Sequence, residues 1–74
     1  MHLYDFEVLL EGAVIAAKRA IRLSDTRAAW PGIARIAKSF DQPGCKIWVL
    51  DESGRIVILT VVATVLRHAS VLAA

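Results

Sequence analysis

Residues 46–62 read KIWVLDESGRIVILTVV, and this stretch carries the clearest structural signal in the chain. Two hydrophobic, largely β-branched runs, 46–50 and 55–62, flank the polar segment Asp51-Glu52-Ser53-Gly54. Such runs favour strands, and a short polar segment that ends in glycine is typical of a hairpin connection. Gly54 can adopt the positive φ angle that a type I turn followed by a bulge requires. The stretch therefore predicts an antiparallel hairpin.

Both predicted strands are hydrophobic at successive positions rather than at alternate ones. A sheet that is covered on one side only normally alternates hydrophobic and polar residues, so one helix cannot cover both faces here. Monomers avoid an exposed patch of this kind. We therefore expect a symmetric homodimer that buries the second face or joins the sheets edge to edge. The alternative is that the terminal segment folds back as a lid. The residues expected at the interface are Trp48, Leu50, Ile56 and Ile58.

The N-terminal segment alternates over residues 4–11, with Tyr4, Phe6, Val8 and Leu10 on one side and Asp5, Glu7 and Glu11 on the other. This period of two is typical of a half-buried strand. Leu10, Val14, Ala17 and Ile21 also form a helical stripe. The spacing therefore leaves a continuous helix over 6–22 and a β-hairpin as open alternatives.

A helix is expected in the middle of the chain. Ser24 and Asp25 can cap its N-terminus, and hydrophobic residues then recur at helical spacing as far as Phe40. Pro31 is unfavourable inside a helix but suits a first turn, which predicts an irregular start or a restart at this residue. The breakers at 41–44 end the helix. Trp30 is expected to pack at the boundary between helix and sheet.

Three motifs occur in order along residues 3–62: Tyr-x-Phe at 4–6, Leu-x-Asp at 23–25 before an alanine-rich segment, and Ile-x-Val-x-Asp-x-x-Gly-x-x-Val at 47–57. In this pattern the chain resembles a family of small uncharacterised bacterial proteins, a domain of unknown function. The resemblance implies the order β-β-α-β-β and an N-terminal hairpin, and it implies no activity. Pro31 and the hydrophobic tail after Val62 depart from the pattern.

We therefore expect an α+β fold with two layers, a mostly antiparallel sheet and one principal helix in the order β-β-α-β-β. The 74 residues are fewer than the ~100–150 of a common domain, which predicts a single domain over 1–74. Residues 64–74 could extend a strand, form a short helix or fray.

The sequence predicts no catalytic, cofactor-binding or metal-binding site. Cys45 is the single cysteine, which suits a reducing cytoplasm, and the histidines His2 and His68 lie near opposite ends of the chain. The uncharged hydrophobic run 56–66 is shorter than the ~20 residues of a membrane-spanning helix. We expect a cytoplasmic, non-enzymatic interaction module that acts through self-association or a protein partner and does not bind a membrane.

The charge distribution supplies an alternative. Nine basic and seven acidic residues give a net charge of +2, and the basic residues gather in the middle of the chain. Arg27, Arg35 and Lys38 could contact phosphates, so the alternative is a nucleic-acid or anionic-ligand accessory protein. The segment has no second helix at helix-turn-helix spacing and no aromatic pair for base stacking, and ordinary solvated faces explain the charges more simply.

Overall fold

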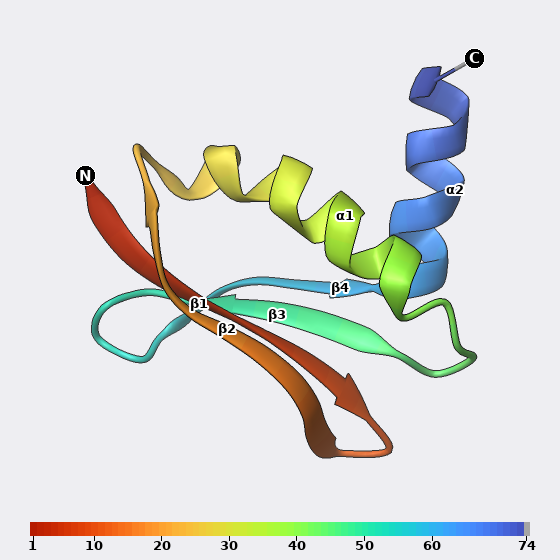
Figure 1. Cartoon of the computed structure of the whole chain (residues 1–74), viewed down its shortest axis with the longest axis horizontal. Coiled ribbons are helices and arrows are strands. Elements are labelled where there is room, and N and C mark those ends of the chain that lie inside the picture. Colours follow the sequence, from red (N-terminus) through yellow and green to blue (C-terminus); the bar gives the residue numbers. More distant parts are fainter. Residues whose placement is uncertain (74) are drawn as a thin grey trace.

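A computed structural model describes the backbone of residues 1–73 and the side chains of residues 1–67. The elements in chain order are β1 (His2–Leu10), β2 (Ala13–Leu23), the 3-10 helix η1 (Thr26–Ala29), α1 (Trp30–Ser39), β3 (Lys46–Leu50), β4 (Ile56–Val61) and α2 (Val62–Ala73). All neighbouring strands are antiparallel, in the sheet order β2-β1-β3-β4. Both α-helices lie on one side of this sheet (Figure 1). The expected α+β class with an antiparallel sheet is confirmed.

The N-terminal segment forms a hairpin rather than a continuous helix. Glu11 and Gly12 connect β1 to β2 with φ angles of 52° and 80°. Two consecutive positive φ angles define a type I′ turn, whose twist matches that of the flanking strands. The alternation over 4–11 was therefore the informative pattern, because the turn at Gly12 interrupts the helical stripe.

The core lies between the sheet and the helices. Tyr4, Phe6 and Val8 of β1 are buried on this face, as the alternation predicts. Gly32 of α1 lies above Phe6, and a Cβ atom at this position would approach the Phe6 ring to 3.3 Å. The small residue therefore permits the close packing of helix on sheet. The other buried core residues are Ala29, Ile33, Ile36, Ala37, Cys45, Ile47, Val49, Ile58, Val62 and Val65.

The start of the helical segment is irregular, as Pro31 predicts. Asp25 caps η1 by accepting a hydrogen bond from the Ala28 backbone N–H at 3.0 Å, and α1 then begins with Pro31 in its first turn. The expectation for Trp30 is wrong, because its residue surface is 46% exposed. Ala29 and Ile33 face the sheet, and Trp30 follows Ala29 by about 100° around the helix axis, which turns it toward solvent.

The hairpin of β3 and β4 has the expected turn. The Gly54 N–H donates to the Asp51 carbonyl at 3.0 Å, and the Asp51 N–H donates to the Arg55 carbonyl at 2.9 Å. Gly54 has a φ angle of 82°, which the glycine-specific bulge after a type I turn requires. The prediction of this hairpin is confirmed.

The terminal segment after β4 forms α2, one of the three conformations that the sequence left open. Val62 and Val65 are buried in the core, and α2 packs beside α1 (Figure 1). The alternative in which the tail folds back over the second sheet face is therefore wrong. The packing of α2 adds to the core on the helix side and leaves the opposite face, called the open face below, uncovered by residues 1–67.

Candidate functional site

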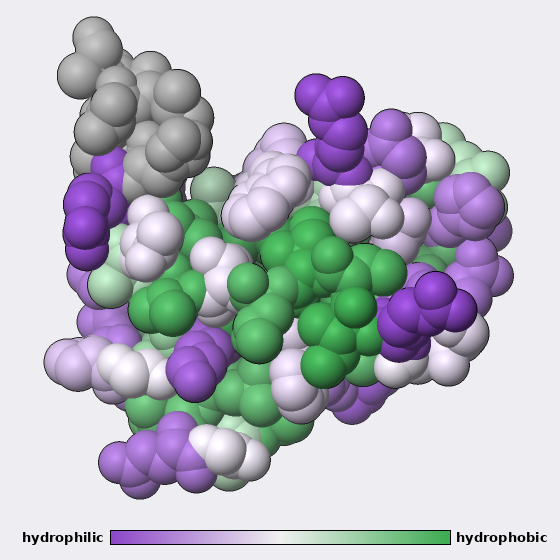
Figure 2. Space-filling view, turned by 180° about the vertical axis from the view of Figure 1, so that it is seen from behind, coloured by the Kyte–Doolittle hydropathy of each residue, from purple (hydrophilic) through white to green (hydrophobic). Residues whose placement is uncertain are grey.

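The open face carries a row of hydrophobic side chains along β3 and β4. Trp48 pairs with Leu59, and Leu50 pairs with Ile56. Residues that lie directly opposite each other point to the same face, so all four side chains lie on the open face. Leu59 is 59% exposed and Ile56 is 44% exposed. Seen from behind, with the helix layer above the sheet, hydrophobic side chains also form a broad area in the middle of the molecule, flanked by hydrophilic ones (Figure 2). We call Trp48, Leu50, Ile56, Leu59 and Val61 the β3–β4 patch.

One residue expected in this patch lies on the other side of the sheet. Ile58 is only 9% exposed and pairs with the buried Val49 in the core, so its assignment to the exposed interface is wrong. Val49 pairs with Ile58, but the next residue, Leu50, pairs with Ile56. The register therefore shifts at this point, and Val57 is an extra residue without a partner on β3. This irregularity reverses the alternation along β4, and Leu59 takes the exposed position in place of Ile58.

Trp48 is held on the open face by a buried carboxylate. Its indole N–H donates to Glu7 Oε1 at 2.5 Å. Arg19 from β2 donates to Glu7 Oε2 at 3.1 Å and lies 3.5 Å from Asp5 Oδ2. Glu7 is only 9% exposed although it lies on the open face. A buried carboxylate is stable when its oxygens accept such bonds, and here they fix the position of the indole ring.

The sequence pattern did not reveal this arrangement. Alternation places Asp5 and Glu7 together on an ordinary exposed strand face. Residues 7, 19 and 48 lie on three different strands, and only the sheet order β2-β1-β3 brings them together. The one sequence signal for this hydrogen bond was that Glu7, an acceptor, and Trp48, an indole N–H donor, both lie on the open faces of predicted strands.

A hollow of about 490 Å³ adjoins the β3–β4 patch. Its hydrophobic walls include Leu9, Trp48 and Leu59, and Lys46 and Glu11 supply charge. The tip of the β1–β2 hairpin and the loop before β3 complete it. The lining residues are Leu9, Glu11, Gly12, Gly44, Lys46, Trp48 and Leu59.

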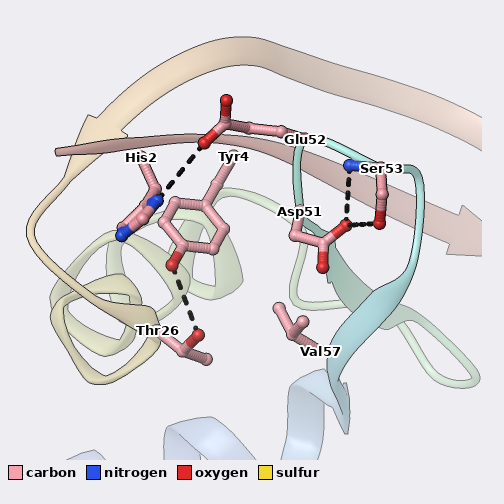
Figure 3. Close-up of a pocket in the computed structure, with 7 residues that line it drawn as sticks. All are labelled: His2, Tyr4, Thr26, Asp51, Glu52, Ser53 and Val57. Atoms are coloured by element: carbon pink, nitrogen blue, oxygen red, sulfur yellow. Dashed lines mark hydrogen bonds and ion pairs between the residues drawn. The ribbon is translucent and has the colours of Figure 1, made fainter.

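A second hollow of about 290 Å³ lies at the β3–β4 turn (Figure 3). The Tyr4 hydroxyl faces the Thr26 hydroxyl at 3.4 Å, and His2 Nδ1 lies 3.4 Å from Glu52 Oε1. These groups pair with one another, which leaves them less available to a ligand. The lining residues are His2, Tyr4, Thr26, Asp51, Glu52, Ser53 and Val57.

Asp51 organises the turn beside this second hollow. Its Oδ1 accepts from the Ser53 hydroxyl at 2.6 Å, the Ser53 N–H at 2.9 Å and the Arg55 N–H at 3.0 Å. The bond from the Ser53 hydroxyl, aided by that from the Arg55 N–H, lowers the pKa of Asp51 below its ordinary value. Ser53 therefore acts as a donor to a carboxylate, which is turn chemistry and not activation of a nucleophile.

The remaining expected residues lie apart from the β3–β4 patch. Arg27 on η1 and Arg35 and Lys38 on α1 are exposed on the helix layer, and within residues 1–67 none of the three forms an ion pair. Cys45 is a buried free thiol. The described side chains contain no group of three residues able to hold a metal ion.

The comparisons with known proteins leave the chain without an assigned relative. No protein-family model, curated protein or solved structure matches it. Within the described part of the chain, α1 and α2 are both too short to cross a bilayer as apolar helices.

Proposed function

We propose that the protein is a small non-enzymatic interaction module that uses the β3–β4 patch to bind another protein surface. The observation that carries the proposal is the exposure of Leu59, Ile56 and Val61, at 59%, 44% and 41%, on one edge of the sheet. A contiguous hydrophobic patch on a small domain is typical of an interaction site.

The tethered Trp48 supports this role. Tryptophan is enriched among the residues that dominate binding energy at interfaces. Glu7 fixes the Trp48 ring before any partner arrives, which lowers the entropic cost of ordering it on binding. Asp5 and Arg19 lie beside the hydrophobic row and supply the polar rim of such an interface.

The proposal is tested with Leu59→Glu in the full chain. Leu59 is 59% exposed, so a carboxylate there remains solvated in the free protein and opposes only association. The matched control is Trp30→Glu, because Trp30 is 46% exposed on α1, away from the open face. Trp48→Asp is less suitable because it deletes the donor to Glu7 and adds a second carboxylate beside it.

Each variant is immobilised and used to capture proteins from native extract, and its mass in solution is measured by light scattering. We expect the wild type and Trp30→Glu to capture the same partner or self-associate, and Leu59→Glu to lose this binding by at least tenfold. Equal binding by all three chains contradicts the proposal, and so does a wild type that stays monomeric and captures nothing.

The proposal places the protein in the reducing cytoplasm, where the buried thiol of Cys45 stays reduced. The resemblance to a family of small bacterial proteins stays a prediction and adds no activity.

A second candidate function is supported by the basic helix layer. Arg27, Arg35 and Lys38 are exposed and can bind phosphates of a nucleic acid or of another anionic ligand. Reversing all three charges is expected to abolish salt-sensitive binding to an RNA or DNA oligonucleotide while the β3–β4 patch keeps its partner. Equal oligonucleotide binding by the triple variant and the wild type contradicts this candidate.

A further inference from the structure

The backbone of β4 presents unpaired hydrogen-bonding groups at one edge of the sheet. The Val62 N–H donates to the Cys45 carbonyl at 3.0 Å, in register with the next pair, Lys46 and Val61. Positions along an antiparallel pair alternate between those bonded to the neighbour and those that face away. Leu59 therefore directs both its N–H and its C=O group away from β3, toward the free edge. Val61 directs its N–H the same way, whereas its C=O precedes the first residue of α2 and accepts the first hydrogen bond of that helix.

The two edges of the sheet differ in protection. β4 contains no charged residue in Ile56–Val61. The opposite edge, β2, carries Lys18, Arg19 and Arg22, and its pairing with β1 shifts register twice. Charges and bulges are the features by which edge strands resist further pairing. The β2 edge is therefore guarded along its length, whereas β4 has one irregularity, at Val57, and is unprotected over residues 59–61.

We infer that the partner of the β3–β4 patch is a second copy of this chain, paired antiparallel through β4 across a twofold axis at Leu59. The inference rests on the proposed function and names its partner. An axis at Leu59 places the edge-facing groups of the two Leu59 residues opposite each other. The paired segment is short, because Val61 meets the irregularity at Val57 of the second copy and α2 begins at Val62.

The geometry favours a second copy over a foreign strand. Twofold pairing covers both open edges at once and produces a continuous sheet that ends on each side at a guarded β2. Trp48 lies beside Leu59 in register, so the hydrophobic row continues from one copy into the other. A foreign strand would cover one edge and introduce another.

The charges on the open face oppose the other symmetric arrangement, in which two open faces stack. Arg19 is 61% exposed and Asp5 is 37% exposed at their side chains. Stacking the full faces would remove both charges from water, and removing charges from water is costly. Pairing through β4 leaves them solvated. A pair of short strands buries less than the ~800 Å² per partner of a standard interface, so we expect the dimer to dissociate on dilution.

The first test is cross-linking of Leu59→Cys under mild oxidation. Residues in a hydrogen-bonded antiparallel pair have Cα atoms about 5.5 Å apart, within the range that a disulfide spans. The wild type is one control, because its single cysteine is buried. Val14→Cys on β2 is the matched control, because Val14 is 47% exposed at the guarded edge. We expect Leu59→Cys to form the covalent dimer at least tenfold faster than Val14→Cys, and equal rates overturn the inference.

The second test separates the backbone of β4 from its side chains. Leu59→Pro removes an N–H that faces the free edge and bonds to nothing in β3, which is the position where an edge strand tolerates proline. Leu59→Ala shortens the same side chain and keeps the N–H. We expect light scattering to find a dimer at high concentration for the wild type and Leu59→Ala, and a monomer for Leu59→Pro with an unchanged circular dichroism spectrum.

The outcomes distinguish this inference from the proposed function. A folded Leu59→Pro that dimerises like the wild type overturns pairing through β4. A wild type that is monomeric at high concentration, yet captures a partner that Leu59→Glu loses, overturns the second copy and keeps the proposed function. If Leu59→Pro does not fold, the cross-linking rates decide.

Discussion

Replacing Glu7 with alanine is expected to destabilise the protein by about 2–3 kcal/mol, although the side chain lies on the open face. Its carboxylate accepts from the Trp48 indole at 2.5 Å and from Arg19 at 3.1 Å. A hydrogen bond to a charged group contributes about 1.5–3 kcal/mol. The Arg19 side chain is 61% exposed, so water screens its ion pair, which contributes about 0–1 kcal/mol. The Trp48 bond therefore dominates.

The assay is urea unfolding followed by circular dichroism, which does not depend on the tryptophans. For a chain of this size the expected loss corresponds to a melting temperature lower by about 10–20 °C. Trp48→Phe keeps an aromatic ring and deletes the donor, and the double-mutant cycle with Glu7→Ala should give a coupling energy of about 1.5–3 kcal/mol. Arg19→Ala should cost at most about 1 kcal/mol.

Two results refute this reasoning. If Arg19→Ala costs as much as Glu7→Ala, the ion pair and not the indole bond holds the carboxylate. If the effects of Glu7→Ala and Trp48→Phe add without coupling, the tether between β1 and β3 contributes nothing to stability.

Three further predictions concern the fold. Ile33→Ala should cost about 2–5 kcal/mol in urea unfolding, because Ile33 is 0% exposed between α1 and the sheet. Ala20→Gly should raise the melting temperature and stabilise the fold by about 1 kcal/mol, because Ala20 has a φ angle of 57°, which is strained for any residue with a Cβ atom. An unchanged melting temperature would contradict backbone strain at Ala20. The Asp51 pKa is lowered from 3.8 in the folded state, so its contribution to stability is present above pH 3.8 and is lost as the pH falls below it. When the free energy of unfolding is measured as the pH is lowered, Asp51→Asn should lack this loss of stability. A pH dependence identical to that of the wild type would contradict the prediction.

Local patterns predicted the elements because their signals are contained within a few neighbouring residues. The alternation over 4–11 specified β1 and its buried side, and Asp51 with Gly54 specified the turn between β3 and β4. Asp25 and Pro31 together predicted a helix with an irregular start. In each case a backbone preference or a short-range hydrogen bond acts without help from distant residues.

The same patterns failed where the outcome depended on pairing between distant strands. A single irregularity at Val57 moves Ile58 into the core and exposes Leu59, and no local signal marks the position of that irregularity. The burial of Glu7 was also missed, because Arg19 and Trp48 reach it from neighbouring strands.

The sequence by itself determined that the hydrophobic residues exceed what one helix-covered face can bury, because that follows from composition and the consecutive hydrophobic runs at 46–62. Only the tertiary structure decided where the excess lies. α2 packs beside α1 and fills the core side, because Val62 and Val65 continue the buried surface at the end of β4. The β3–β4 patch stays exposed beside a strand edge whose backbone groups face away from β3, since register and sheet order are properties of the assembled strands.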